Sequence, residues 1–308
     1  MKKQTPKISV ILPSYNGEKY IGQSIQSVID QTEQDWELII VNDCSTDNTL
    51  KICESFANKD KRIKVISNKI NKKLPASLNV GFSVARGKYL TWTSDDNFYR
   101  PDAFEKMADY LDCHKDIDLI SMAFDVLDEK DNFLYTAYVG QEYKRCQAAL
   151  ICGNNIGAAF MYRKSVADKI GEYDTGTFCA EDYDYWCRIA LNGKIGYVSD
   201  NVYVYRLQSN SLTATKQTQI QEKTKYIQHK YANAFFNKFK FTESDKIKFY
   251  VNVLHEIPHE HKQKIRFNRF IAKYFVSLLF FSSKLRHKIK NRLLLKDKYS
   301  FSQPNKEC

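Results

Sequence analysis

The first hundred residues alternate short apolar runs with longer segments of helical periodicity. Buried strands are predicted where β-branched and other apolar residues follow one another between turn residues, at 8–12, 38–41, 63–66 and 89–93. Helices are predicted between them, at 18–31, 47–58 and 75–86. This alternation favours an α/β fold with a mostly parallel, Rossmann-like sheet and helices on both of its faces.

Residues 101–213 are patterned less regularly. We expect a helix at 102–111, strands at 119–124 and 133–139, a small-residue loop at 153–162 that enters a strand, and a helix at 181–191. Beyond residue 213 the chain is rich in lysine and aromatic residues and contains no glycine, which predicts helix. We therefore divide the chain into a domain at 1–213 and a mainly helical extension at 214–308.

Charge separates these two parts. Residues 214–308 contain 21 Lys and Arg against seven Asp and Glu, a formal charge of +14, whereas residues 1–213 carry −3. The eight cysteines form no C-x-x-C pair, a usage typical of buried thiols in a reducing compartment. The first apolar run ends at Pro13, too soon for a signal-peptide core, and the longest uncharged apolar stretch, 274–283, is about half of the ~20 residues that span a bilayer. We expect a cytoplasmic protein.

Polar turns follow three of the predicted N-terminal strands. They read PSYNG at 13–17, NDCSTD at 42–47 and SDDN at 94–97. In open parallel sheets ligands bind beyond the carboxyl ends of the strands, so these turns form the candidate site. No G-x-G-x-x-G follows the first strand and no G-x-x-x-x-G-K-[ST] occurs, which removes the fingerprints of dinucleotide-binding and P-loop proteins.

Four segments in this order resemble the motifs of family-2 glycosyltransferases. They read VILPSYNGEKYIGQSIQSVIDQT from residue 10, ELIIVNDCSTDNT from 37, LPASLNVGFSVARGKYLTWTSDDN from 74 and AEDYDYWCRI from 180. The resemblance covers residues 7–213 and implies the GT-A fold, a nucleotide-sugar donor and an inverting transfer. The basic extension carries no motif of that family.

The resemblance implies a donor site in the first two turns. An ionised Asp43 accepts hydrogen bonds and could receive the N3–H of a uracil-type base, while Pro13 and Tyr15 could wall the base and ribose. Asn16, in the same turn, is assigned to the donor as well, and Lys73 is the candidate cation for the diphosphate. The alternative is that the aspartates of the second turn only shape that turn and cap a helix.

Asp95 and Asp96 resemble the acidic metal motif of the family. Adjacent carboxylates repel unless a cation lies between them and the diphosphate, and Mg²⁺ or Mn²⁺ prefers such oxygen ligands. Many relatives carry D-S-D-D where this chain has TSDD. We therefore assign Asp96 as the principal ligand and Asp95 to the ribose or a metal-bound water. The family's Y-R-x-H run reads YRLQ at 205–208, so Gln208 replaces the histidine as a weaker, neutral ligand.

Glu181 and Asp182 resemble the family's E-D motif, in which the aspartate is the general base. The acceptor hydroxyl has a high pKa and needs a base within hydrogen-bond reach as the new bond forms. The alternative is that Glu181, Asp182 and Asp184 only favour a helix N-terminus through its dipole. Trp186 either lines the acceptor pocket or, as we prefer, packs in the core.

These assignments predict an inverting glycosyltransferase of the hexosyltransferase type, dependent on Mn²⁺ or Mg²⁺. The expected donor is a UDP-sugar or dTDP-sugar, and the expected acceptor is a surface polysaccharide or lipid-linked oligosaccharide. A sugar nucleotidyltransferase also uses paired aspartates and Mg²⁺, but it would carry a glycine-rich basic loop where this chain has PSYNGE. A nucleic-acid-binding protein would use the +14 extension, although no nucleic-acid motif accompanies that charge.

Residues 269–294 can form one basic amphipathic helix with Phe and Leu on its apolar side. Such a helix can lie in a membrane interface without spanning it, and each basic residue near an anionic surface adds about 1 kcal/mol. We therefore predict peripheral contact with the inner face of the cell membrane. The alternative is that the apolar stripe packs on the domain or forms a homodimer.

Overall fold

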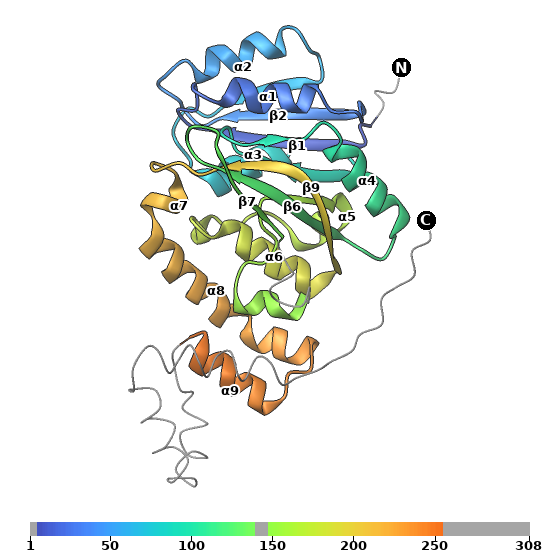
Figure 1. Ribbon diagram of the computed structural model, residues 1–308, viewed down its shortest axis with the longest axis vertical. Helices are drawn as coiled ribbons and strands as arrows, with labels where there is room; N and C mark the ends of the chain where they lie inside the picture. Colours follow the sequence, from blue (N-terminus) through green and yellow to red (C-terminus); the bar gives the residue numbers. More distant parts are fainter. Residues whose placement is uncertain (1–4, 139–146, 255–308) are drawn as a thin grey trace. The chain divides into compact units, whose positions relative to one another are not determined.

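The computed structural model describes residues 5–138 and 147–254 (Figure 1). The chain divides into two compact units, Met1–Phe241 and Thr242–Cys308. Within the described part of the first unit, nine strands form one sheet in the order β3-β2-β1-β4-β8-β6-β9-β5, and β7 pairs with β6. The candidate residues predicted from the sequence all lie in this first unit.

The N-terminal half of the sheet is parallel, as predicted. Its strands are β1 (Ile8–Ser14), β2 (Trp36–Asn42), β3 (Ile63–Ser67) and β4 (Tyr89–Trp92). β1 pairs with β2 on one side and with β4 on the other, and β3 extends the sheet beyond β2. All residues of β1 and β2 are buried, because helices cover both faces of the sheet.

The helices that follow these strands lie on opposite faces. They are α1 (Ile21–Ile29), α2 (Thr49–Ala57), α3 (Leu74–Phe82) and α4 (Ala103–Cys113). Successive side chains of a strand point to opposite faces. Val10 and Leu12 share one apolar cluster with Ile25 of α1, whereas Ile11 points toward α3, where Gly81 leaves room for it. Figure 1 shows α1 and α2 above β1 and β2 and α3 below them.

The second half of the sheet is mixed. Its strands are β5 (Phe98–Tyr99), β6 (Leu119–Leu127), β7 (Phe133–Ala137), β8 (Ala159–Arg163) and β9 (Ile195–Arg206). β8 runs antiparallel between β4 and β6, while β9 runs parallel to β6. The predicted α/β architecture is therefore confirmed, with the parallel pairing concentrated in the first four strands.

Two helix boundaries differ from the predicted ones for local reasons. The helix expected at 18–31 begins only at Ile21, because the chain first turns and the amide N–H groups of Tyr20 and Ile21 donate to the Gly17 carbonyl. The helix expected at 75–86 ends at Phe82. The chain then passes so close to β1 that a Cβ on Gly87 would lie 2.5 Å from the backbone nitrogen of Ser9.

The C-terminal part of the first unit is helical. It contains α5 (Lys164–Ile170), α6 (Glu181–Asn192), α7 (Leu212–Thr215) and α8 (Gln217–Lys238), with short 3₁₀ turns at Gln147–Cys152 and Thr175–Thr177. α8 packs on α6 and buries Ile227 and Phe235. The helical character predicted beyond residue 213 is thus found in the described residues. The predicted domain boundary at 213 stays a prediction.

The described part of the second unit contains α9 (Glu243–Asn252). A reciprocal capping box starts this helix, since the Thr242 hydroxyl accepts from the Asp245 amide and the Asp245 carboxylate accepts from the Thr242 amide. None of the helices in the described ranges is long and apolar enough to cross a bilayer. The interfacial helix predicted at 269–294 lies outside the described residues.

Candidate active site

The turns after β1 and β2 are fastened to each other. The Asn16 amide donates to the Ser45 hydroxyl at 3.0 Å, and the Asn16 side-chain oxygen accepts from the Thr46 amide at 2.8 Å. Asn16 takes a left-handed φ of 56°, which polar asparagine tolerates better than most residues. Tyr15 leaves about half of its surface exposed, whereas Pro13 is buried inside the sheet. Tyr15 and Asn16 are therefore the members of this turn that face solvent.

Asp43 is occupied by the segment that follows β3. Its Oδ1 accepts from the Asn68 side-chain amide and the Lys72 backbone amide, both at 2.8 Å, and its Oδ2 accepts from the Lys73 amide at 2.9 Å. The carboxylate is 4% exposed. Asp43 thus shapes the loop that presents the exposed Lys73 side chain, and one lone pair of Oδ2 stays available to a base.

Asp95 lies between the first turn and the end of β4. The Ser14 hydroxyl donates to its Oδ2, and the absence of a side chain on Gly17 gives the carboxylate the space that it fills. Burial raises the pKa of Asp95 to about 7, opposed by the hydrogen bond from Ser14.

Asp96 is held from the far side by the segment after β9. The Gln208 side-chain amide donates to Asp96 Oδ2 at 2.5 Å, and the Arg206 guanidinium donates to the Asp96 main-chain carbonyl. The other carboxylate oxygen, Oδ1, is buried and has no hydrogen-bond partner among the described residues. Burial also raises the pKa of Asp96. A buried acceptor without a donor is costly, which marks Oδ1 as a position for an electropositive ligand.

The residues at this position fit a divalent cation in part. Asp96 Oδ1 is an unpaired hard oxygen, the ligand type that Mg²⁺ and Mn²⁺ prefer. In the described ranges no group of three or more His, Cys, Asp or Glu side chains could hold an ion by itself. Gln208 turns its NH₂ group toward Asp96, so its carbonyl oxygen is free for another partner. The protein thus offers a few ligands and leaves the remainder to a substrate.

Two neighbouring carboxyl groups begin α6. Asp182 Oδ2 accepts from the Asn154 side-chain amide at 2.8 Å, and Oδ1 accepts from the Tyr183 amide at 2.6 Å. Glu181 is buried, and its Oε2 accepts from the Cys179 amide at 2.8 Å. Burial, followed by the charge of Asp182, raises the pKa of Glu181 to about 8, and burial also raises the pKa of Asp182.

This pair therefore holds one proton near neutral pH. Glu181, whose pKa burial raises to about 8, keeps that proton, and Asp182 beside it is half-buried. A carboxylate with a raised pKa is a stronger base than an exposed aspartate. The arrangement suits Asp182 to accept a proton, with Glu181 as its neutral neighbour.

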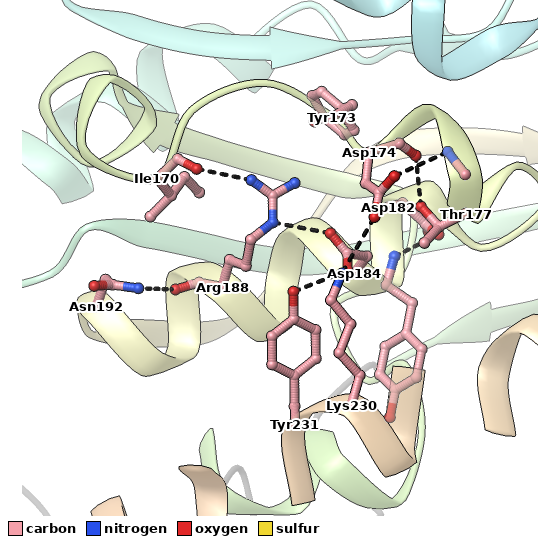
Figure 2. A network of polar contacts seen from close by, with 12 residues as sticks. Ile170, Tyr173, Asp174, Thr177, Asp182, Asp184, Arg188, Asn192, Lys230 and Tyr231 are labelled. Carbon is pink, nitrogen blue, oxygen red and sulfur yellow. Dashed lines mark hydrogen bonds and ion pairs between the residues drawn. The ribbon is translucent and has the colours of Figure 1, made fainter. Parts of the chain in front are cut away.

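The rest of α6 is structural. Trp186 is fully buried and packs edge-to-face on Phe160 with ring centroids 4.6 Å apart, which supports core packing over a place in the acceptor pocket. Figure 2 shows Asp184 surrounded by donors. This fully buried carboxylate accepts from Arg188 at 2.8 Å and from Lys230 and Tyr231 of α8, both at 2.9 Å.

The structure adds residues that the sequence did not single out. Arg206 is buried and reaches Asp131 at 2.7 Å and the Gln23 side chain at 2.9 Å, besides the Asp96 carbonyl. It lies in the YRLQ segment, so its place in that motif was the available signal. Asn154, 28 residues before its partner Asp182, carried no such signal.

The predicted residues thus fall into two groups. One lies at the ends of β1 and β4, where Ser14 contacts Asp95 and where Gln208, from the segment after β9, contacts Asp96. The other begins α6, where Asn154 contacts Asp182 next to Glu181.

Comparison with known proteins identifies the family to which the chain is similar. The model of the family described as glycosyl transferase family 2 matches residues 9–171. An uncharacterized glycosyltransferase of Haemophilus influenzae is 32% identical over 253 residues, which cover 76% of this chain and 75% of the relative.

Solved structures show the same fold at lower identity. Staphylococcus aureus TarS 1–349 in complex with UDP-GlcNAc is 22% identical with a TM-score of 0.63, over 80% of this chain and 71% of that one. The chain covers 43% of the longer TarS structure. The mannosyltransferase PcManGT of Pyrobaculum calidifontis, in complex with GDP-Man and Mn²⁺, is 13% identical with a TM-score of 0.57, over 95% and 81% of the two chains.

Proposed function

The chain belongs to glycosyl transferase family 2 and is a glycosyltransferase, and we propose that it moves a sugar with inversion from a nucleoside diphosphate donor. A UDP-sugar is the first candidate donor. The acceptor is a hydroxyl group of a glycan or lipid-linked oligosaccharide in surface polysaccharide synthesis. The observation that carries the proposal is the buried, unpaired Oδ1 of Asp96 at the same sheet edge as the donor turns.

The donor would lie across the carboxyl ends of β1, β2 and β4. Tyr15 offers an exposed ring to the base or ribose, and the remaining lone pair of Asp43 Oδ2 accepts the N3–H of a uracil-type base. The exposed Lys73 side chain supplies positive charge for the diphosphate. The TarS complex, which holds UDP-GlcNAc in the same fold, supports a UDP-sugar as the first donor to test.

Asp96 and Gln208 are the residues that would hold a divalent cation next to the diphosphate. When bound, such a cation supplies neutralising charge to the departing nucleoside diphosphate. Gln208 fixes the orientation of Asp96 through the hydrogen bond to Oδ2. Oδ1 takes no part in that bond and has no other hydrogen-bond partner among the described residues. Arg206 fixes the backbone of the same residue. The Mn²⁺ present in the PcManGT complex supports the choice of ion.

Asp182 would act as the general base. Asn154 holds Oδ2 and the start of α6 holds Oδ1, so the carboxylate has a fixed orientation. It takes the proton from the acceptor hydroxyl while that oxygen forms its bond to the anomeric carbon and the bond to the diphosphate breaks. A single displacement of this kind inverts the anomeric configuration and needs no covalent intermediate.

Binding of UDP in the presence and absence of Mn²⁺ tests the donor site. We expect Asp96→Ala to lose the Mn²⁺-dependent part of UDP affinity, measured by calorimetry in Mn²⁺ and in chelator. Asp116→Ala, which removes an exposed carboxylate at the far end of the sheet, is the matched control and should bind as wild type. Equal Mn²⁺ dependence in wild type and Asp96→Ala would contradict the assignment.

The cytoplasmic location, the membrane contact through residues 269–294 and a homodimer stay predictions. Co-sedimentation with anionic vesicles at low and high salt tests the membrane contact. We expect deletion of 269–308 to release the protein from the vesicles while donor hydrolysis persists. Equal pelleting of the full chain and the truncated chain would contradict it.

A further inference from the structure

An aromatic face of the sheet adjoins the candidate active site. β6 lies between β7 and β9, and in this register Val126 of β6 is opposite both Tyr135 of β7 and Tyr205 of β9 (Figure 1). Directly paired residues point to the same face of a sheet. Tyr135 is 53% exposed, although large apolar rings are usually covered. The face therefore carries one open ring and one partly buried ring, on the two strands that flank Val126.

A pocket lined mainly by polar residues lies beyond the ends of β6 and β9. It has a volume of about 650 Å³ and is lined by the β6–β7 turn, including Asn132, and by the segment 207–217. One of its residues, Gln208, donates to Asp96 of the site already described. Leu207 and Gln208 also continue directly from β9, the strand that carries Tyr205. The pocket thus adjoins both Asp96 and the strand of Tyr205.

The position of Tyr205 fixes where this surface begins. Tyr205 adjoins Arg206, which donates to the Asp96 carbonyl, and lies three residues before Gln208, which donates to the Asp96 carboxylate. In the proposed reaction, Asp96 lies on the donor side and Asp182 on the acceptor side of the bond that forms. A chain of sugars whose terminal hydroxyl meets Asp182 would therefore extend past Tyr205 toward Tyr135 and the pocket.

We propose that Tyr135, Tyr205 and the pocket lined by Asn132 and Thr213 form a subsite for the sugars of an oligosaccharide acceptor that precede the reacting one. This inference rests on the proposed function and specifies its acceptor. Aromatic rings offer flat apolar surfaces to the C–H faces of pyranose rings. Hydroxyl and amide groups of the pocket, from Gln208, Thr213 and Gln217, match sugar hydroxyls.

The charge of the pocket specifies the acceptor further. Its charged side chains are Asp128, Glu129 and Lys130. Hydrogen bonds from Asn132 and Ser209 hold the pKa values of Asp128 and Glu129 below their usual range, so both are ionised at neutral pH. The lining is therefore net negative. An uncharged oligosaccharide fits it, whereas a polyanionic glycan would be repelled.

Binding of defined glycans to the full chain tests this subsite. The probes are neutral hexose oligosaccharides of one to six units on an array, with UDP and Mn²⁺ present. We expect binding to strengthen from one unit to three. We expect Tyr135→Ala to lower it about tenfold for the longer probes, within the range that aromatic stacking contributes, and Tyr135→Phe to restore it. Tyr226→Ala on α8 is the matched control, because Tyr226 is also 53% exposed.

Affinity for UDP, measured on the same samples, separates this inference from the proposed function. Wild-type protein that fails to bind UDP would contradict the proposed function. Wild-type protein that binds UDP, together with Tyr135→Ala that binds the oligosaccharides as wild type, would overturn the acceptor subsite alone. The subsite would also be overturned if no neutral oligosaccharide binds or if polyanionic glycans bind better.

Discussion

At the start of α6, two adjacent residues of the same chemistry have different environments. Glu181 is buried and accepts one backbone amide, while Asp182 is half-buried and accepts one backbone amide and the Asn154 side chain. Their mutual repulsion and unequal burial leave the proton on Glu181.

The first prediction is that Asp182→Asn lowers sugar transfer by roughly 10²–10⁴-fold, the usual scale for loss of a general base. The amide preserves the shape of the side chain and its contact with Asn154 but cannot take a proton. UDP affinity should stay near that of wild type, because Asp182 is not assigned to the donor. Asp168→Asn, an exposed position on α5, is the control. Transfer at the wild-type rate by Asp182→Asn would show that another group is the base.

The second prediction concerns stability and pH. Glu181 has its pKa raised from 4.5 to about 8, so between these values the folded chain holds a proton that the unfolded chain releases. Stability should therefore fall as pH rises from about 4.5 to about 8. Glu181→Gln removes this titration, and its free energy of unfolding should fall by about 4 kcal/mol less over that range. Urea unfolding at pH 5 and pH 8 measures both slopes, and parallel slopes would contradict the buried protonated Glu181.

The residues that the sequence identified are those whose roles are local. Asp95 and Asp96 could be assigned because they directly follow a buried strand, and Glu181 and Asp182 because they begin a helix. The sequence could not show that the Asp43 carboxylate is mostly occupied by the loop of Asn68, Lys72 and Lys73, because that depends on the left-handed φ of 70° at Lys73.

At the scale of elements, the two donor turns behave as one unit. The Gly17 amide donates to the Thr49 hydroxyl at 2.8 Å, and the Asn48 amide at the start of α2 donates to Glu18 at 2.9 Å. Turns that exchange hydrogen bonds in both directions hold each other's backbone in place. This explains how Gly17 can lie next to Asp95 without belonging to a helix or strand.

The third prediction is that Gly17→Ala lowers stability by about 1–3 kcal/mol and weakens UDP binding. The added Cβ would overlap the Asp95 carboxylate and lie 2.7 Å from the Ser14 hydroxyl oxygen, so the turn must move. Gly22→Ala is the control, because its Cβ would meet nothing nearer than 4.0 Å and helix α1 should gain about 0.5–1 kcal/mol. Similar effects of the two substitutions, in thermal unfolding and UDP titration, would contradict the close approach of Asp95 to Gly17.

The sequence could not predict that α8 packs on α6. The chain beyond residue 213 was predicted to be helical, but its partner was left open. Asp184 is fully buried under α8, where Lys230 and Tyr231 supply its donors (Figure 2). These residues are 46 and 47 positions apart from Asp184, so no local pattern relates them.

The fourth prediction is that Lys230→Met destabilises the first unit by about 1–3 kcal/mol while UDP affinity is retained. The substitution keeps the apolar stem and leaves the buried Asp184 with Arg188 and Tyr231 only. Lys194→Met breaks an exposed pair with Asp116 at 3.1 Å and should cause no measurable loss. Chemical denaturation of wild type and both variants tests this. If Lys230→Met is as stable as wild type and Lys194→Met, the Lys230–Asp184 pair contributes nothing to stability.

At the scale of the whole molecule, the parallel half of the sheet was the predictable part. Its strands are continuous apolar runs, and each helix between them is short and periodic. The mixed half was harder because β9 carries the polar residues Ser199, Asp200 and Asn201 in its middle, where its register on β6 shifts. The end of β9 and the segment after it nevertheless place Arg206 and Gln208 against Asp96. The mixed half of the sheet therefore supplies residues to a site that begins in the parallel half.

Turnover of a panel of nucleotide sugars by the full chain tests the proposed activity most directly. The wild-type protein is incubated with UDP-, GDP- and dTDP-sugars in Mn²⁺, and release of the nucleoside diphosphate is followed. We predict release from a UDP-sugar or dTDP-sugar, lost in Asp96→Ala and lowered in Asp182→Asn. Absence of turnover for all three donors, or a thermal shift with nucleic acid and none with any nucleotide sugar, would contradict it.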